Sequence, residues 1–334
     1  MLSSKFKDFL TFLKSKNILI VTHDLVDIDS LVSCFTLKIF LTQFFKNQDI
    51  SIYFSELTKS TKNFIINFTA KFPEFDFSYK KHFNLSNIDV FLVVDTNNLN
   101  QIEFNNNLDI SRTNIPYIFI DHHYTRNDSN KPTLNLINQN YSSTAEIILE
   151  LWEYFSLKLI VPLKILIISA ILTDSGFFKH GNNATILNVS KLLCEDINIQ
   201  DILLLLEDDI DISEKIANIK GLQRVELIRE ENYLIGLTNV SSFGASVASM
   251  LIKMGFDIGI VISKEQNLSR FNTRAKKKVC IETGLNLGKI LGEISEQYQG
   301  NGGGHDGAAS LAISMESDEI VLEIIDKIKE YLSP

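Results

Sequence analysis

Four clusters of acidic and histidine residues stand out in the sequence, and each one follows an apolar segment. They are His23, Asp27 and Asp29 in "THDLVDID", Asp95 in "FLVVDT", Asp121, His122 and His123 in "YIFIDHH", and Asp174 in "ILTDSGFF". Carboxylates gathered in one cleft repel one another, and some of them would have to bind protons. Two divalent cations would instead neutralise four such carboxylates. Imidazole and carboxylate ligands without thiolate suit manganese best, with cobalt, iron, magnesium or zinc as alternatives. The clusters therefore predict a two-metal centre.

Each cluster also has a simpler structural interpretation. A single aspartate after an apolar run is often a helix N-cap or a turn residue, and this alternative applies to Asp95 and Asp174. Asp29 could cap the helix that follows it, and residues 121–123 could form a surface loop. Four matched clusters in sequence order rarely arise from caps alone, which favours the metal centre. The histidines for which we predict no role in the centre are His82 and His180, although His180 could lie at its edge.

Apolar strands and helices alternate in the first half of the chain, and they must position these clusters. Strands are expected at 17–22, 50–54, 89–95 and 117–121. Helices are expected at 5–16, 29–46, 58–71, 142–157, 162–172, 184–194, 199–207 and 212–223. This alternation predicts an α/β domain with a doubly wound, mainly parallel sheet. Such sheets bind ligands beyond the carboxyl ends of their strands, or at the start of the following helix, where the clusters are expected to fall.

The second half restarts the alternation on a smaller scale. Strands are expected at 225–230, 233–239, 257–264, 268–274 and 308–314, and helices at 243–254, 286–298 and 318–332. A chain of 334 residues is longer than one ordinary core requires. We therefore expect a metal-binding catalytic domain over 1–206, a linker helix over 207–224, and a smaller α/β substrate-binding domain over 225–334.

The composition of the chain limits the classes of partner that we expect it to bind. A net charge of −9 argues against coating long duplex nucleic acid, but it allows a small anionic substrate held through metal ions. The three separated cysteines indicate reduced thiols in a cytoplasmic protein. The most apolar run, 159–173, is too short to span a bilayer, and the N-terminus has no signal-peptide pattern, so no membrane partner is expected. A homodimer is compatible with the sequence, although no segment demands one.

The four motifs resemble those of the DHH phosphoesterase superfamily, namely His-x-x-x-Asp-x-Asp-Ser, a strand-end Asp, Asp-His-His and Thr-Asp-Ser-Gly-Phe-Phe. In the second half, "RFNTR" (270–274) and "NGGGHDGAA" (301–309) resemble the Arg-x-Ser-x-Arg and Gly-Gly-Gly-His-x-x-Ala-Ala motifs of the domain that accompanies it. The departures are Val26 and Ile28 for Pro and Gly, Asn272 for Ser, and Ser310 for Gly. They leave the ligand positions intact and bear more on the choice of substrate.

The resemblance implies a role for each residue of these motifs. One manganese ion would be held by His23, Asp27 and Asp95, and the other by Asp29, Asp95, His122 and Asp174, so that Asp95 bridges the two. Asp121 would orient a neighbouring ligand, and His123 would lie near the scissile phosphate. The residues expected to reach substrate phosphates are Arg270, Arg274 and His305, and either His123 or His305 could assist the leaving oxygen. The glycines expected to allow close backbone approach to the ligand are Gly302, Gly303 and Gly304.

The resemblance therefore implies a manganese-dependent phosphodiesterase or phosphatase. Candidate substrates are nanoRNA, 3′-phosphoadenosine 5′-phosphate (pAp), and linear or cyclic dinucleotides. The alternatives are an exonuclease or pyrophosphatase of the same superfamily, or a non-enzymatic nucleotide-binding or assembly protein that retains the fold. The basic run Lys276–Lys278 could be a solvated face or an outer guide for phosphates.

Overall fold

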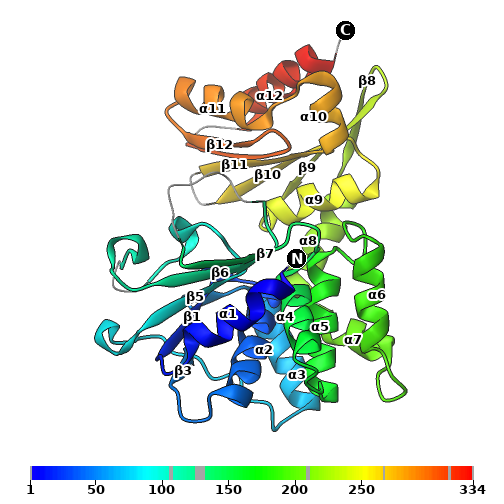
Figure 1. Ribbon diagram of the computed structural model, residues 1–334. Helices are drawn as coiled ribbons and strands as arrows, with labels where there is room; N and C mark the ends of the chain where they lie inside the picture. The colour runs from blue at the N-terminus through cyan, green and yellow to red at the C-terminus, as the bar shows by residue number, and fades with distance from the viewer. Residues whose placement is uncertain are drawn as a thin grey trace. The chain divides into compact units, whose positions relative to one another are not determined.

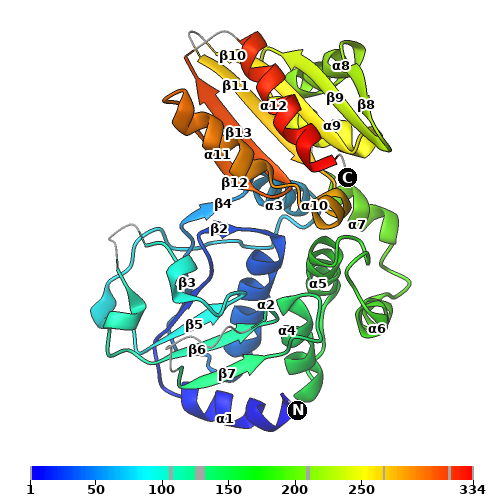
Figure 2. The same ribbon diagram turned by 90° about the horizontal axis from the view of Figure 1, so that it is seen from above.

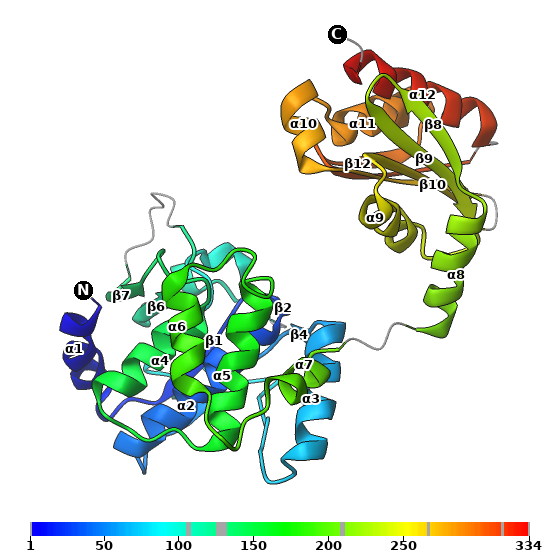
Figure 3. The same ribbon diagram turned by 90° about the vertical axis from the view of Figure 1, so that its right-hand side faces the viewer.

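A computed structural model describes residues 2–104, 108–124, 132–207, 211–265, 268–314 and 317–332 of the chain. The chain forms two compact units, Met1–Asp209 and Ile210–Pro334 (Figure 3). Helix α8 (Ile212–Gln223), which the sequence analysis assigned to a linker, packs on α9 (Gly244–Met254) and β9 (Tyr233–Val240), and so belongs to the second unit. Residues 208–210 of the predicted linker lie outside the described residues.

The first unit is built on a parallel sheet of five strands in the order β3-β1-β5-β6-β7 (Figure 1). The strands are β1 (Ile18–Val21), β3 (Ile50–Ile52), β5 (Val90–Val94), β6 (Tyr117–Asp121) and β7 (Leu134–Ile137). A separate two-stranded pair joins β2 (Leu25–Val26) to β4 (Glu56–Leu57). The chain winds outward from β1 in both directions, so the winding reverses between β1 and β5. The predicted α/β class with a parallel sheet is confirmed.

Helices and connecting segments cover the two faces of this sheet differently. The helices are α1 (Ser3–Leu13), α2 (Ile28–Phe44), α3 (Lys59–Lys71), α4 (Thr144–Tyr154), α5 (Val161–Asp174), α6 (Asn183–Leu192) and α7 (Ile199–Leu205). They share one core with the sheet face that carries Ile20 and Leu92. The other face, which carries Val21 and Phe91, packs against the loops and short 3-10 turns at Leu85–Asn87, Leu99–Gln101 and Ile110–Arg112. Both faces are therefore buried, as parallel strands require.

The second unit is a six-stranded sheet in the order β12-β13-β11-β10-β9-β8 (Figure 2). The remaining strands are β8 (Glu226–Glu230), β10 (Ile258–Glu265), β11 (Leu268–Ala275), β12 (Asn301–His305) and β13 (Ala308–Ile313). Among the described strands of this second sheet, β9 and β10 pair in parallel and the other neighbours pair antiparallel. The remaining helices are α10 (Lys277–Thr283), α11 (Leu287–Gln297) and α12 (Ser317–Leu332). Helices α11 and α12 share a core with one sheet face, and α8 and α9 pack on the other. In neither unit does a helix within the described ranges have the length and apolar character needed to cross a membrane.

Candidate metal centre

The four predicted clusters meet where the winding of the first sheet reverses. His23 follows β1, Asp95 follows the neighbouring strand β5, and Asp121 is the last residue of β6. This crevice, beyond the carboxyl ends of adjacent strands, is the usual ligand site of doubly wound sheets. Asp174 comes instead from the C-terminal end of a helix, α5, rather than from a strand end or a helix start. The centre is thus assembled from segments that are distant in sequence.

Asp95 occupies the middle of the centre in a backbone conformation that few residues adopt. Its φ angle is +62°, in the left-handed region that aspartate enters more readily than most residues. Its N–H donates to the Ile120 carbonyl at 2.9 Å, so strand pairing continues up to this residue before the chain turns. The side chain is 3% exposed and accepts hydrogen bonds from the hydroxyls of Ser30 at 2.5 Å and Thr144 at 2.8 Å. Such local strain persists only where the surroundings enforce it, and it is frequent at functional sites.

Two groups of ligand candidates correspond to the predicted sets, and a third group contains Asp95, Asp121, His122 and His123. Atoms of His23, Asp27 and Asp95 lie within 4.8 Å of one another, and so do atoms of Asp29, His122 and Asp174. Asp95 Oδ2 lies 3.6 Å from His23 Nε2, whereas Asp95 Oδ1 lies 3.8 Å from His122 Nε2. One carboxylate therefore presents a different oxygen to each group, which is the arrangement that a bridging ligand needs.

The second group contains two ligand atoms that lie at ion-pair distance from each other. His122 Nε2 and Asp174 Oδ2 are 3.0 Å apart and buried, yet within the described residues neither makes a hydrogen bond. Two ligands at about 2.1 Å from one ion and at right angles would be about 3 Å apart. The other ring nitrogen, His122 Nδ1, lies 3.3 Å from the Tyr141 carbonyl, a contact that fixes the ring orientation of many metal-bound histidines. These residues fit a divalent cation.

Asp29 is held by the start of another helix. Its Oδ2 accepts the backbone N–H of Thr144 at 2.7 Å and its Oδ1 accepts that of Ala145 at 3.0 Å, at the positive end of α4. The alternative that Asp29 caps its own helix is wrong, because α2 begins at Ile28 and its N-cap is Asp27, which accepts the N–H of Ser30 at 2.9 Å. Oδ2 of Asp29 keeps a second lone pair for a cation, whereas Oδ1 also accepts the hydroxyl of Ser33 at 3.3 Å.

Burial and mutual repulsion shift the protonation of these groups. Burial, followed by the charges of Asp95 and Asp174, raises the pKa of Asp29 well above its usual range. Burial lowers the pKa of His122, but the carboxylates of Asp174 and Asp95 outweigh this effect and raise the pKa to about 9. Without a cation, groups of the centre would therefore bind protons, and these protons would supply the positive charge that a metal otherwise provides.

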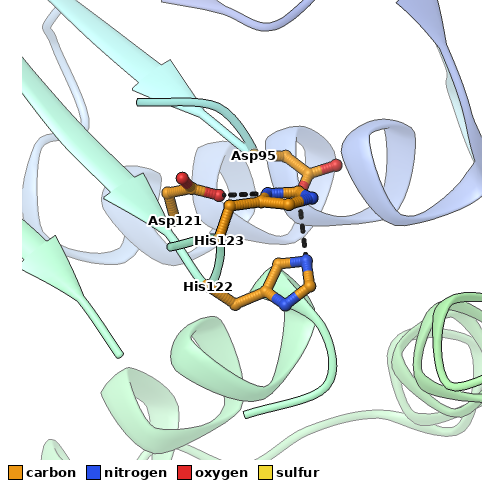
Figure 4. A group of neighbouring side chains, drawn as sticks. All are labelled: Asp95, Asp121, His122 and His123. Carbon is orange, nitrogen blue, oxygen red and sulfur yellow. Dashed lines mark hydrogen bonds and ion pairs between the residues drawn. The ribbon is translucent and has the colours of Figure 1, made fainter. Parts of the chain in front are cut away.

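Asp121 and His123 form a hydrogen-bonded pair beside the two groups (Figure 4). His123 Nδ1 donates to Asp121 Oδ1 at 2.8 Å, and the amide of Asn97 donates to Asp121 Oδ2 at 2.6 Å. Asp121 is fully buried, whereas the His123 side chain is 56% exposed. The hydrogen bond to Asp121, partly opposed by burial, raises the pKa of His123. Asp121 is thus placed to orient His123 toward the cleft.

Two family models match the chain. The model for the N-terminal domain of the DHH family matches residues 17–173, and the model for the DHHA1 domain matches residues 245–333. The chain belongs to the DHH phosphoesterase superfamily. The described ligand candidates that follow β1, β5 and β6 all lie in its DHH domain.

Relatives extend over nearly the whole chain. The uncharacterised protein MJ0988 of Methanocaldococcus jannaschii is 26% identical over 331 residues, which are 96% of this chain and 95% of the relative. An exopolyphosphatase-related protein from Bacteroides fragilis has a TM-score of 0.63 at 16% identity, covering 98% of this chain and 96% of that one. RecJ from Thermus thermophilus, solved with Mn²⁺, has a TM-score of 0.50 at 13% identity, covering 100% of this chain and 55% of RecJ. At these identities the structures show a shared DHH fold.

In the DHHA1 unit, the predicted phosphate-binding side chains share one face of the sheet. Arg270 and Arg274 are four residues apart on β11, so they point to the same side. Ala308 lies opposite Arg274 on one side and opposite His305 on the other, so the His305 side chain is on the same face as the two arginines. In the basic run, Lys276 pairs with Asp257 at 2.9 Å and Lys278 with Glu282 at 3.7 Å. These ion pairs favour the interpretation of the run as a solvated face.

Two of the three glycines expected to allow close approach of a ligand are instead required by the packing of the sheet. A Cβ atom at Gly302 would lie 2.8 Å from the Leu291 carbonyl, and one at Gly304 would clash with the Ala308 carbonyl. These two glycines let β12 lie close to its neighbours. Gly303, at φ +150°, has no described atom near the Cβ position, so it alone of the three leaves open space for a ligand.

Sequence reasoning missed several partners of the ligand candidates. They are the hydroxyl of Thr144, the amide of Asn97 and the carbonyl of Tyr141. These groups are common in loops and at helix starts, and only the fold brings them to the carboxylates. His82 lines a separate cavity with Asn17 and Lys80, and neither His82 nor His180 belongs to a metal-type group among the described residues.

Proposed function

We propose that this chain is a manganese-dependent phosphoesterase that hydrolyses short nucleotides such as nanoRNA, pAp or dinucleotides. One observation carries the proposal: the two oxygens of the buried Asp95 face two separate ligand groups, at 3.6 Å from His23 and 3.8 Å from His122. A single-metal or purely structural site has no need of a shared carboxylate. Manganese is the first cation to test, because the ligands are imidazole and carboxylate and RecJ, a structural neighbour, was solved with Mn²⁺.

The metal ligands of the proposal are the two groups already described. His23, Asp27 and Asp95 would hold one cation, and Asp29, Asp95, His122 and Asp174 would hold the other. When bound, two such cations neutralise the charge of a phosphoester and lower the pKa of an attacking water. Asp95 keeps both groups at a fixed separation, since its backbone and both oxygens are held by hydrogen bonds.

His123 is proposed to act on the leaving oxygen. Its Nδ1–H is bound by Asp121, which leaves Nε2 for the cleft, and the same hydrogen bond raises the pKa of the ring and so favours its protonated form. His305, together with Arg270 and Arg274, is proposed to bind substrate phosphates from the DHHA1 sheet. Guanidinium groups grip phosphate in bidentate fashion, and the three side chains share a face.

The test is a substrate panel with the full chain. We would incubate it with pAp, the dinucleotide pApA, cyclic di-AMP, RNA of five residues, and pyrophosphate, with Mn²⁺ or with a chelator, and separate the products by chromatography. We expect turnover of at least one nucleotide that a chelator abolishes and added Mn²⁺ restores. Turnover of pyrophosphate alone would replace the proposal with a pyrophosphatase. No turnover with Mn²⁺, Co²⁺ or Mg²⁺, together with nucleotide binding, would support the non-enzymatic alternative.

A further inference from the structure

The metal centre opens into two cavities, both within the first unit. One, of about 500 Å³, is lined by His23, Asp95, His123 and Tyr124 among others. The other, of about 300 Å³, is lined by Asp29, Ser60, Phe177 and Leu206 among others. Asp27 and Asp174 line both cavities. A phosphate at the ligand groups would therefore have space on two sides.

Each cavity carries one exposed aromatic ring. Tyr124 directly follows His123 and is 77% exposed in the larger cavity. Phe177 is 50% exposed in the smaller one. Exposed rings are ordinary one at a time, but each of these two borders the carboxylate centre. The larger cavity is otherwise lined by polar residues, and the smaller one also by Ile28 and Leu206. Both cavities beside the centre therefore present an exposed aromatic ring.

The backbone around Phe177 is strained in a way that core packing does not explain. Gly176, Phe177 and Phe178 have φ angles of +57°, +55° and +69°, and two of these residues are not glycine. The Phe178 ring packs against the core, and its N–H donates to Ser175 Oγ at 3.1 Å. The Phe177 ring lines the cavity instead, while its N–H donates to the Leu172 carbonyl at 2.7 Å. The left-handed conformation costs about 1–3 kcal/mol at each of the two phenylalanines but little at Gly176, and such strain gathers at functional sites.

The charges of the two linings restrict what they can bind. Among the described residues that line these cavities there is no lysine or arginine. Of the described lining residues, none carries a permanent positive charge, so bound cations would supply the charge that holds a phosphate there. Groups beside that phosphate would meet the Tyr124 ring and amides in the larger cavity, and the Phe177 ring, apolar side chains and hydroxyls in the smaller one. Such surroundings favour uncharged planar groups over further phosphates.

We propose that Tyr124 and Phe177 each stack on one nucleobase, on opposite sides of a phosphodiester at the metal centre. The inference rests on the proposed function and narrows it to a substrate with two bases around one scissile phosphate, that is, a dinucleotide rather than pyrophosphate or pAp. Stacking a base on an aromatic side chain contributes about 1–3 kcal/mol, or roughly 5- to 150-fold in affinity. Tyr124 and Phe177 are specificity residues under this proposal and make no contact with the reacting atoms.

The experiment varies the ring on the protein and the base on the substrate together. Substrates are a dinucleotide with both bases, the two forms that lack one base or the other, and the form that lacks both. Variants are Tyr124→Leu, Tyr124→Phe, Phe177→Leu and Phe177→Tyr, and matched controls are Tyr154→Leu and Phe44→Leu, which remove partly exposed rings outside both cavities. The measured quantity is kcat/KM for each pair, separated into kcat and KM.

We expect each leucine variant to lose about 5- to 150-fold in kcat/KM on the full dinucleotide, mainly through KM, and its aromatic counterpart to keep most of the activity. Each loss should shrink when one particular base is absent, and the two variants should respond to different bases. Equal losses on the base-free and full dinucleotides would overturn the proposal, as would losses no larger than those of Tyr154→Leu and Phe44→Leu.

Failure of this inference is distinguishable from failure of the proposed function. Hydrolysis that is indifferent to both rings would leave a phosphoesterase and remove the stacking sites. If no phosphoester is hydrolysed, the same variants are titrated with a dinucleotide containing 2-aminopurine, whose fluorescence is quenched by stacking. Quenching that both leucine variants weaken would retain the base sites in a binding protein, and quenching unchanged in both would reject them.

Discussion

The two ends of the parallel sheet carry the same residue types but hold them differently. Asp89 and Asp95 bracket one strand, β5. At the amino end, Asp89 accepts the backbone N–H of Asn17 at 2.7 Å, and Asp49 lies 3.6 Å from the ammonium of Lys80. At the carboxyl end, Asp95 lies among histidines and further carboxylates. An acidic residue beside a strand is therefore weak evidence for a site, whereas its partners distinguish a satisfied surface group from a ligand.

Replacing Asp89 and Asp95, the carboxylates that flank β5, one at a time tests this contrast most strongly. Asp95→Asn should weaken Mn²⁺ binding by more than about 100-fold, since even residues that only position metal ligands contribute about 10- to 100-fold. Any phosphoesterase turnover should fall with it. Mn²⁺ affinity is measured by titration calorimetry on the full chain, and turnover with the most active substrate of the panel.

Asp89→Asn is the matched control, because it alters the carboxylate that precedes the same strand and accepts a backbone N–H outside the centre. We expect its Mn²⁺ affinity to equal that of the natural chain. Should Asp95→Asn bind Mn²⁺ as tightly as Asp89→Asn does, the shared-carboxylate geometry would have no role in metal binding.

The free energy of unfolding of the metal-free chain should depend on pH because titratable groups gather at the carboxyl end of the parallel sheet. The pKa of His122 is about 9 when folded against 6.5 when unfolded, so folding favours its proton. The stabilisation is complete below pH 6.5 and is lost as pH rises through about 9, and it amounts to at most about 3 kcal/mol. The raised pKa of Asp29 acts in the same direction. The free energy of unfolding is measured by urea titration at several pH values.

Bound Mn²⁺ should reverse this trend, since His122 must lose its proton to act as a ligand. Stabilisation by Mn²⁺ should therefore grow from pH 6.5 to 9. His122→Gln should flatten the metal-free profile, whereas His82→Gln, which alters the amino end, should leave it intact. A metal-free chain that becomes more stable as pH rises over this range would contradict the arrangement.

The sequence indicated that these residues gather at the carboxyl end because the ligand candidates obey a local rule. His23, Asp95 and Asp121 each follow or end an apolar strand, and parallel strands bring such positions to one edge. The parallel α/β class followed from the same alternation. Strand β7 was missed because "LNLI" is short and alternates, and β12 was missed because its glycines read as a turn.

What the sequence could not indicate are contacts between distant segments. Asp29 was expected to be a ligand or a cap of its own helix, but its oxygens accept N–H groups at the start of α4. No local pattern links residues 29 and 144, since their pairing depends on how the two helices pack. Likewise, no local pattern links Asn97 to Asp121, and only the fold brings its amide to that carboxylate.

The hydroxyl of Thr144 offers the finest test of the contrast. It is buried and donates to Asp95 Oδ1 at 2.8 Å, while its backbone N–H holds Asp29, so Thr144→Val removes only the hydroxyl bond. We expect a loss of about 10-fold in Mn²⁺ affinity and about 1 kcal/mol in the free energy of unfolding. At the amino end, Ser51→Ala removes a hydroxyl that donates to Asp49 at 2.7 Å, and it should leave Mn²⁺ affinity unchanged. Equal affinities in the two variants would mean that the strained backbone of Asp95 and the hydroxyl of Ser30 suffice to hold its carboxylate, because those two constraints remain when Thr144 loses its oxygen.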